Sequence, residues 1–315
     1  MVTYDDLLAH APKDAPYRPL LEALFVGKRW ITEPMLKSLD PSEITTYLNE
    51  VAQIWSAASG MKGLPADQAV AQLVGGLLFD SDTFLRLQIE FAKTGELKSK
   101  DFDAVNAAVY SSPEKMAQYL DGLLVTYIGW PNHYRLWRYY VERYLPRGTY
   151  GACLEIGPGH GWLARGQLMA NPKNRLTGLD ISPSSVAYTS GILKASGIAA
   201  DRFSLSIADC RKGLPHGSPT YDRVVIAEVI EHLDDPDTLL RSAVAHAHAE
   251  TMFFITTTVN IEAIDHIYLF RDLEEVRAMM RRCGLEIVDE LDLPLSMKLK
   301  MERPMFEVAV ICKKA

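Results

Sequence analysis

The chain has 315 residues, of which 48% are hydrophobic and 23% charged, so its composition excludes a disordered or fibrous protein. This length predicts two domains of roughly 150 residues each, or one domain with a large extension. Lys and Arg number 33 against 40 for Asp and Glu, a net charge of -7, and neither the part before Pro146 nor the part after it is basic. A nucleic-acid-binding scaffold, which needs many phosphate contacts, is therefore disfavoured.

The part of the chain before about residue 146 reads as helical. Its apolar residues recur near the 3.6-residue period and are separated by Pro, Gly, Ser or Asp. The pattern predicts helices over Tyr17–Phe25, Pro41–Ala58, Ala66–Leu78, Asp82–Lys93, Pro113–Ile128 and Asn132–Tyr144. Pro146 and Gly148 then break the pattern. We therefore predict a helical N-terminal domain, residues 1–145, that serves as a lid or in dimerisation, and a second domain, residues 146–315.

In the second part, short runs rich in apolar and β-branched residues alternate with helical stretches. The predicted strands are Ala152–Ile156, Arg175–Asp180, Phe203–Ile207, Arg223–Ala227, Met252–Thr257, Leu285–Asp289 and Met305–Cys312. Seven strands with crossover helices predict an α/β fold with a doubly wound parallel sheet. No helical stretch precedes the last strand, so this strand could be an antiparallel addition.

The first predicted strand ends in a glycine-rich turn that reads Glu-Ile-Gly-Pro-Gly-His-Gly over residues 155–161. Glycines at positions 157, 159 and 161 allow a tight turn from strand to helix and leave room for a ligand against the main chain. Such a loop can bind a nucleotide, although a purely structural turn would look the same.

Acidic residues follow four consecutive predicted strands. Glu155 lies beside the glycines, Asp180 ends the second strand, Asp209 follows the third and Glu228 follows the fourth. Because parallel strands present their carboxyl ends at one edge of the sheet, these carboxylates should line one ligand site. Asp180 is placed to accept hydrogen bonds from ribose hydroxyls, and Asp209 from an adenine amine.

With these motifs, residues 150 to 315 resemble the class I S-adenosylmethionine-dependent methyltransferases. The resemblance implies a Rossmann-like sheet of order 3-2-1-4-5-7-6 with strand 7 antiparallel, and S-adenosylmethionine as the cofactor. It also implies roles for the motif residues. Glu155, Gly157, Pro158, Gly159 and Gly161 would hold the methionyl end, Asp180 with Ile181 the ribose, Asp209 with Cys210 the adenine, and Glu228 would lie near the sulfonium. A dinucleotide reductase fits less well, because its third glycine is spaced differently.

Several residues are candidates for chemistry on the acceptor. His232, Glu231 and His266 could provide acid-base catalysis if the acceptor must lose a proton. Tyr134 shares a predicted helix face with Trp130 and Trp137, and these aromatic residues could form a lid over the sulfonium cation. The alternative is that they only pack the two parts of the chain together.

A metal site is an alternative interpretation of the same region. Glu228, Glu231 and His232 with a later histidine resemble the metal ligands of small-RNA 2′-O-methyltransferases. Because Glu-x-x-Glu-His also occurs in small-molecule methyltransferases without metal, we expect no metal. The four cysteines lack metal-binding spacing, so we also expect neither a zinc site nor a disulfide framework.

Together with the resemblance, these patterns predict a methyltransferase that acts on a small molecule in specialised-metabolite biosynthesis. One alternative is a methyltransferase-like cyclase that converts S-adenosylmethionine itself to azetidine-2-carboxylate and methylthioadenosine. Another is a catalytically silent binding protein. We expect no nucleic-acid partner, and a homodimer is compatible with the helical extension. The acidic N-terminus and the lack of apolar runs of about 20 residues predict a cytoplasmic protein without a membrane span.

Overall fold

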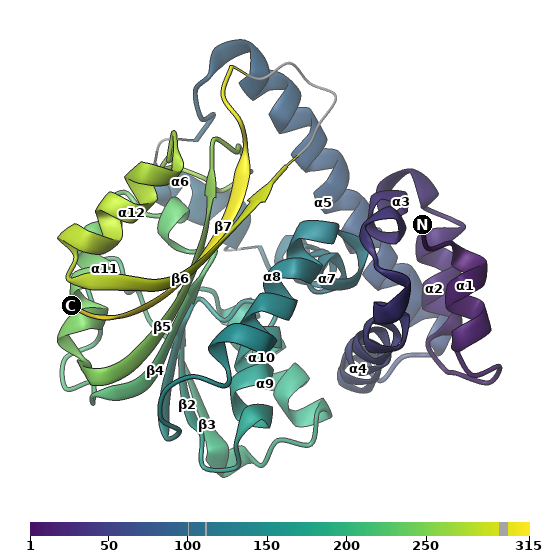
Figure 1. Ribbon diagram of the computed structural model, residues 1–315, viewed down its shortest axis with the longest axis horizontal. Coiled ribbons are helices and arrows are strands. Elements are labelled where there is room, and N and C mark those ends of the chain that lie inside the picture. The colour runs from purple at the N-terminus through teal and green to yellow at the C-terminus, as the bar shows by residue number, and fades with distance from the viewer. Residues whose placement is uncertain (100, 111, 296–301) are drawn as a thin grey trace.

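A computed structural model describes residues 1–99, 101–110, 112–295 and 302–315 (Figure 1), without the side chains of residues 108 and 109. Its first part is helical, as predicted, and none of the described helices is long and apolar enough to cross a membrane. The helical elements are α1 (Tyr4–His10), α2 (Arg18–Phe25), α3 (Arg29–Ser38), η1 (Pro41–Glu43), α4 (Ile44–Lys62), α5 (Ala66–Thr94), α6 (Phe102–Val105), η2 (Asn106–Tyr110), α7 (Pro113–Gly129), α8 (Pro131–Tyr139) and η3 (Tyr140–Tyr144).

Helix α5 differs from the sequence prediction, because the two helices expected over Ala66–Leu78 and Asp82–Lys93 are one continuous helix. The segment between them contains Asp80 and Ser81 but neither proline nor glycine. Ser81 is buried in the structure, and the Asp80 carboxyl faces the backbone of Gly122 in α7. The polar residues between the two predicted helices therefore lie on the packed face of one long helix.

The second part forms the predicted seven-stranded sheet. Its strands are β1 (Ala152–Ile156), β2 (Arg175–Asp180), β3 (Phe203–Ile207), β4 (Tyr221–Ala227), β5 (Ala247–Val259), β6 (Leu285–Pro294) and β7 (Phe306–Lys314). They lie in the order β3-β2-β1-β4-β5-β7-β6. Strand β7 runs antiparallel to both β5 and β6, whereas the remaining pairs are parallel. The sheet order and the antiparallel last strand are confirmed.

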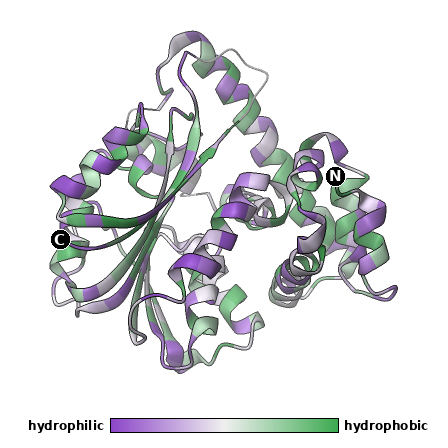
Figure 2. Cartoon of the chain, in the orientation of Figure 1, coloured by the Kyte–Doolittle hydropathy of each residue, from purple (hydrophilic) through white to green (hydrophobic). Residues whose placement is uncertain are grey.

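Helices cover both faces of the sheet (Figure 1). One layer consists of α11 (Pro236–Ala245) and α12 (Leu273–Arg282), and the other contains α9 (Trp162–Ala170), α10 (Pro183–Ala195) and the N-terminal helices. The central strands are mostly apolar (Figure 2) because both of their faces are covered. In β4, Val224 and Ile226 pack toward α11 and α12, while Val225 packs in the core shared with the N-terminal helices.

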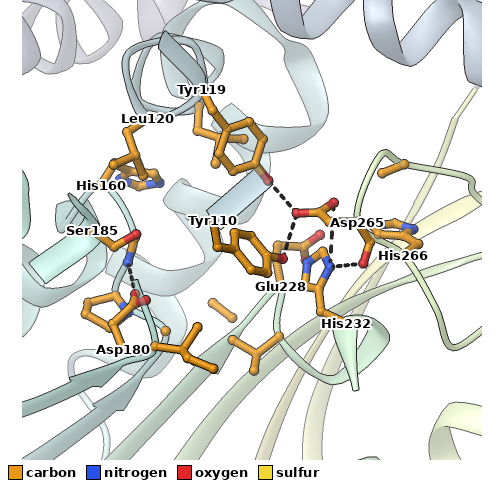
Figure 3. A pocket seen from close by; sticks show the side chains of 18 of the residues that line it. Tyr110, Tyr119, Leu120, His160, Asp180, Ser185, Glu228, His232, Asp265 and His266 are labelled. Carbon is orange, nitrogen blue, oxygen red and sulfur yellow. Dashed lines mark hydrogen bonds and ion pairs between the residues drawn. The ribbon is translucent and has the colours of Figure 1, made fainter. Parts of the chain in front are cut away.

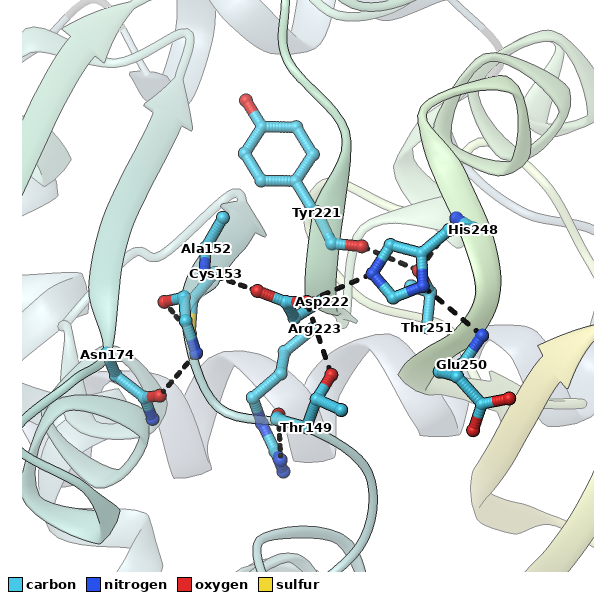
Figure 4. Close-up of polar contacts among 11 residues, drawn as sticks. Thr149, Ala152, Cys153, Asn174, Tyr221, Asp222, Arg223, His248, Glu250 and Thr251 are labelled. Atoms are coloured by element: carbon cyan, nitrogen blue, oxygen red, sulfur yellow. Dashed lines mark hydrogen bonds and ion pairs between the residues drawn. The ribbon is translucent and has the colours of Figure 1, made fainter.

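The helical part joins the sheet through polar contacts at the amino end of β4 (Figure 4). Arg223 is fully buried, and its guanidinium donates to the carbonyl oxygens of Tyr144 at 2.9 Å and Arg147 at 2.6 Å. The neighbouring Asp222 accepts from the backbone N–H of Ala152 at 2.7 Å. These bonds satisfy the carbonyls at the end of η3 and fix where β1 begins.

One buried apolar cluster crosses the predicted domain boundary. It contains Tyr47 and Val125 of the helical part together with Phe254 and Ala309 of the sheet. The helical part is thus packed onto one face of the sheet, which places its residues against the carboxyl edge of the strands. The division between residues 145 and 146 stays a prediction.

Candidate active site

A cavity of about 280 Å³ lies between the carboxyl ends of the strands and the helical part. Figure 3 shows residues of both parts pointing into it. Its sheet side carries acidic and histidine residues at or after the carboxyl ends of the strands, together with apolar residues, whereas its helical side is mainly aromatic and apolar. That second side includes Phe84, Leu87, Phe102, Tyr110, Tyr119, Leu120, Tyr127 and Trp130. The cavity therefore combines convergent polar groups with walls that exclude water, which is typical of small-molecule sites.

The glycine-rich turn lines the cavity at the carboxyl end of β1. Gly157 donates its N–H to the carbonyl of Leu179 at 2.8 Å and has a φ of 66°. A Cβ at Gly157 would lie 2.7 Å from Val229, whereas a Cβ at Gly159, whose φ is 52°, would meet nothing nearer than 3.9 Å. The turn therefore requires left-handed conformations, and at Gly159 it leaves open space beside the main chain for a ligand.

Glu155 lies at the end of β1 and is almost completely buried, with an exposed fraction of 2%. Its carboxylate accepts a hydrogen bond from Nε2 of Gln167 at 2.9 Å. Burial raises the pKa of Glu155 to about 8. A cationic ligand group in the cavity would lower this pKa and restore the negative charge, so the carboxyl is suited to bind a positively charged ligand.

Asp180 ends β2, and its side chain lines the cavity (Figure 3). Its two oxygens accept from the backbone N–H groups of Ser182 at 2.8 Å and Gly159 at 3.2 Å. Burial raises the pKa of Asp180 to about 6. Each carboxylate oxygen keeps a free lone pair, so the group can still accept from a diol.

Asp209 belongs to a cluster that reaches the helical part. The guanidinium of Arg211 donates to both Asp209 oxygens, at 2.8 to 3.1 Å, and to Asp103 at 3.2 Å. The same guanidinium lies 4.0 Å from the ring centre of Phe102. Helix α6 is thus held over this end of the cavity, where Cys210 is buried.

Glu228 directly follows β4 and has a φ of 52°, which is unusual for a residue other than glycine. Thr256 of β5 fixes it, since the threonine hydroxyl donates to the Glu228 carboxylate at 2.6 Å and accepts from its N–H at 3.0 Å. Burial raises the pKa of Glu228. Such a strained residue that is held by its surroundings marks a functional site.

Two histidines and an aspartate meet at the far end of the cavity (Figure 3). Nδ1 of His232 donates to the carbonyl of Asp265 at 2.9 Å, and the rings of His232 and His266 have centroids 5.1 Å apart. The Asp265 carboxylate accepts from the hydroxyls of Tyr110 at 2.9 Å and Tyr119 at 3.2 Å. Although burial opposes it, the two histidines and the two hydroxyls hold the pKa of Asp265 below its ordinary value. The tyrosines thereby tie the helical part to the loop after β5.

Comparison with known proteins identifies the sheet domain. The sequence model of a methyltransferase domain matches residues 154–253, which span the glycine turn, Asp180, Asp209 and Glu228. The chain therefore contains a methyltransferase domain of the S-adenosylmethionine-dependent kind. No curated protein sequence matches the methyltransferase.

Solved structures share its fold at low sequence identity. The mitomycin 7-O-methyltransferase MmcR is 16% identical with a TM-score of 0.52, over 82% of this chain and 73% of that chain. The pyocyanin biosynthetic protein PhzM is 18% identical with a TM-score of 0.52, over 80% and 77%. The O-methyltransferase NcsB1 from neocarzinostatin biosynthesis is 12% identical with a TM-score of 0.53, over 84% and 94%. These matches extend beyond the sheet into the helical part of the methyltransferase.

Most of the residues predicted for the site do line the cavity of the methyltransferase. They are Glu155, Gly157, Pro158, Gly159, Asp180, Ile181, Asp209, Cys210, Glu228, His232 and His266. Gly161 lies behind the lining, where a Cβ would meet Thr189 at 2.9 Å, so its place is structural. Glu231 is fully buried beneath the two histidines and accepts from the hydroxyl of Thr257 at 2.8 Å.

The catalytic role predicted for Tyr134 requires a correction. Its ring packs edge-on against Tyr47, 5.4 Å between centroids, within the core of the helical part. Tyr134 is not among the described residues that line the cavity, and neither is Trp137. Of the three aromatic residues on the predicted lid, the structure brings only Trp130 to the cavity, because that face of α8 packs inward rather than over the site.

The sequence interpretation missed several lining residues. Tyr110, Tyr119 and Asp80 come from helices whose register to the sheet no local pattern reveals. Glu307 lies on β7 opposite His133, with 3.7 Å between its carboxylate and Nε2 of the histidine. Burial raises the pKa of Glu307 and lowers that of His133 to about 4, so this imidazole is neutral at pH 7. Of these missed residues, only Glu307 had a sequence signal, because it is an acid within the otherwise apolar run of the last strand.

Proposed function

We propose that this methyltransferase transfers the methyl group of S-adenosylmethionine to a hydroxyl oxygen of a small molecule bound in the cavity, in a biosynthetic reaction. The observation that carries the proposal is that a single cavity joins the predicted donor residues to the His232, His266 and Asp265 cluster. The tyrosines of the helical part close it over that cluster. The cavity also continues past Glu228 to His133 and Glu307, which supports a second substrate beside the donor.

The residues fit the donor in charge and in space. Gly159 would leave its backbone open to the methionyl end, and buried Glu155 would regain its charge beside a cation. Asp180 with Ile181 would hold the ribose, and Asp209 with Cys210 would meet the adenine under α6. Glu228 would lie near the methyl group, where Thr256 fixes its carboxylate.

A sulfonium methyl is already a strong electrophile, so the residues mainly orient the two substrates and exclude water. We assign the acceptor side to His232 and His266, with Glu231 beneath them. Burial lowers the pKa of His266 to about 4, which leaves that imidazole neutral and its lone pair available at pH 7. These groups therefore favour an acceptor that must lose a proton, such as a hydroxyl.

The proposal includes the choice of partners. The net charge of -7, and a cavity whose described lining residues include no lysine or arginine besides Arg211, support a small acceptor rather than a nucleic acid. The names of the similar structures MmcR and NcsB1 include O-methyltransferase, which is consistent with an oxygen acceptor. A cytoplasmic location and a homodimer are compatible with this function.

The experiment is an assay of the purified enzyme with donor alone and with a panel of hydroxylated aromatic and aliphatic acceptors. We expect adenosylhomocysteine only when an acceptor is present. Methylthioadenosine from the donor alone would instead indicate the cyclase. Donor binding by calorimetry without turnover on any acceptor would favour the silent binding protein.

A further inference from the structure

We propose that Glu231, His232 and His266 bind one divalent transition-metal ion, which faces the acceptor end of the cavity. The three residues come from two segments, since Glu231 and His232 lie in the short helix η5 (Ile230–His232) after β4 and His266 lies in the loop after β5. One donor atom from each lies within 4.8 Å of the others. This site deepens the proposed function, but its existence can be tested without any acceptor.

Hydrogen bonds orient both imidazoles as metal ligands. Nδ1 of His232 lies 2.9 Å from the carbonyl of Asp265, and Nδ1 of His266 lies 3.0 Å from the carbonyl of Ile261. A carbonyl oxygen can only accept, so each Nδ1 carries the hydrogen, and the lone pair of each neutral ring is on Nε2. Metal-binding histidines are usually held by such a bond from the second nitrogen to a carbonyl or carboxylate.

Glu231 supplies an observation that is independent of the histidines. Its side chain is fully buried, and its Oε2 accepts from the hydroxyl of Thr257 at 2.8 Å, while its Oε1 accepts from no N–H or hydroxyl group and the Glu228 carboxyl is a close neighbour. A buried carboxylate oxygen without a partner is costly. A cation held between Oε1 and the two imidazoles would offset this cost, and the bond from Thr257 would hold the carboxylate in place.

The backbone holds the two ligand-bearing segments in register before any ion binds. The carbonyl of Glu231 accepts from the N–H groups of Ile267 at 3.0 Å and Tyr268 at 2.9 Å, which directly follow His266 in the same loop. Tyr110 and Tyr119 fix the loop from the other side through Asp265. The ligands therefore need little rearrangement to meet at one point.

The charge around the site also favours a cation. Glu228, Asp265 and Glu307 line the cavity near the histidines. Among the described lining residues, Arg211 is the only lysine or arginine, and Asp209 and Asp103 already bind its guanidinium. No lysine or arginine among those lining residues is thus available to balance the carboxylates at the acceptor end.

Two imidazoles and one carboxylate suit Mn²⁺, Fe²⁺, Co²⁺ or Zn²⁺ better than Mg²⁺ or Ca²⁺, which prefer oxygen ligands alone. Three protein ligands leave coordination positions open. His232 and His266 line the cavity, so an acceptor oxygen can reach an open position. Coordination would lower the pKa of an acceptor hydroxyl and thereby assist its methylation.

The test is a titration of metal-free wild-type protein with Co²⁺, followed by its visible absorption and by metal analysis after gel filtration. We expect one cobalt ion per chain, loss of the absorption band in His266→Ala and Glu231→Gln, and an unchanged band in the matched control His246→Ala. His246 directly follows α11, its Nδ1 donates to the carbonyl of Ser242 at 2.9 Å, and it is not among the described residues that line the cavity. Circular dichroism and calorimetry with S-adenosylmethionine check that each variant is folded.

Thr257→Val keeps all three ligands and removes only the hydrogen bond to Glu231, so its cobalt affinity should be about 10- to 100-fold lower than that of the wild type. This variant tests the site even if His266→Ala and Glu231→Gln do not fold. Absence of a saturable band in wild type, or a band that persists in His266→Ala and Glu231→Gln, would overturn the metal site. Donor binding and turnover by metal-free protein would leave the proposed function standing. Cobalt binding without methyl transfer would instead refute the function and leave the site.

Discussion

The hydroxyl of Tyr110 donates a hydrogen bond to the carboxylate of Asp265 at 2.9 Å, across a sequence separation of 155 residues. Tyr119 donates to the same oxygen, Oδ2, at 3.2 Å. Both tyrosines belong to the helical part, whereas Asp265 follows β5 and its carbonyl accepts from His232. The helical part therefore determines the shape of the acceptor site through this one carboxylate.

We expect Tyr110→Phe and Tyr119→Phe each to lower kcat/KM for the acceptor on the order of tenfold, because each removes a hydrogen bond to a charged group, worth about 1.5–3 kcal/mol. Steady-state kinetics at saturating donor measures the effect. Tyr188→Phe is the matched control, since its hydroxyl donates to Asp121 at 2.8 Å outside the cavity lining. An equal loss of kcat/KM in the control would mean that the tyrosines act only on general stability.

The donor site can be tested by comparing two aspartates. Asp180→Asn should weaken S-adenosylmethionine binding roughly 10- to 100-fold, because the amide would replace a charged acceptor for the ribose. Asp209→Asn should have a smaller effect, because both Asp209 oxygens already accept from Arg211. Calorimetric titration gives both affinities. A larger effect at Asp209 than at Asp180 would contradict the proposed donor orientation.

Donor binding should also depend on pH through Asp180. Its pKa is raised to about 6, so the carboxylate is ionised above that pH and protonated below it. Affinity should therefore be full near neutral pH and fall as pH drops through about 6, by at most tenfold per pH unit. Calorimetry from about pH 5 to 8 in the wild type and in Asp180→Asn measures this dependence. The same profile in both proteins would assign the dependence to another group.

The sheet and the donor half of the site could be predicted because their signals are local. The glycines at 157 and 159, and acids such as Asp180 that end a strand, sit at fixed places in consecutive strand–turn–helix units, and topology alone brings them to one edge. The alternation of strands and helices indicates a doubly wound sheet, whereas the strand order follows from the resemblance to the methyltransferase family.

The acceptor half could not be predicted, because it depends on tertiary packing. Asp265 meets Tyr110 only because α5 is unbroken and carries α6 and η2 over the sheet. Tyr134 shows the opposite error. Its spacing from Trp130 identifies a helix face correctly, but periodicity does not say whether that face points to the cavity or to Tyr47.

The glycine turn offers a further test of donor binding. Gly157→Ala should destabilise the fold by more than the roughly 1–2 kcal/mol that a left-handed alanine costs, because its Cβ would lie 2.7 Å from Val229. Gly63→Ala is the control, since Gly63 has a φ of 60° and nothing within 4 Å of a Cβ. Denaturant unfolding compares the two, and calorimetry should show weaker donor binding only for Gly157→Ala. Equal destabilisation would mean that Val229 moves away freely.

Two substitutions one helical turn apart distinguish an aromatic residue that lines the cavity, Trp130, from one in the core, Tyr134. Trp130 lines the cavity, with its ring 5.8 Å from Phe84 and 5.1 Å from His133, so Trp130→Ala should raise the acceptor KM. Tyr134→Phe should leave kcat and KM unchanged, because the Tyr134 hydroxyl is buried without a partner and does not reach the cavity.

The same reasoning predicts how Tyr134→Phe changes the stability of the protein. Because Tyr134→Phe removes a buried hydroxyl that makes no hydrogen bond, it should leave the melting temperature unchanged or raise it. Kinetics at several acceptor concentrations and thermal unfolding decide the matter. A large drop in kcat for Tyr134→Phe with an unchanged melting temperature would restore the catalytic role that its spacing first indicated.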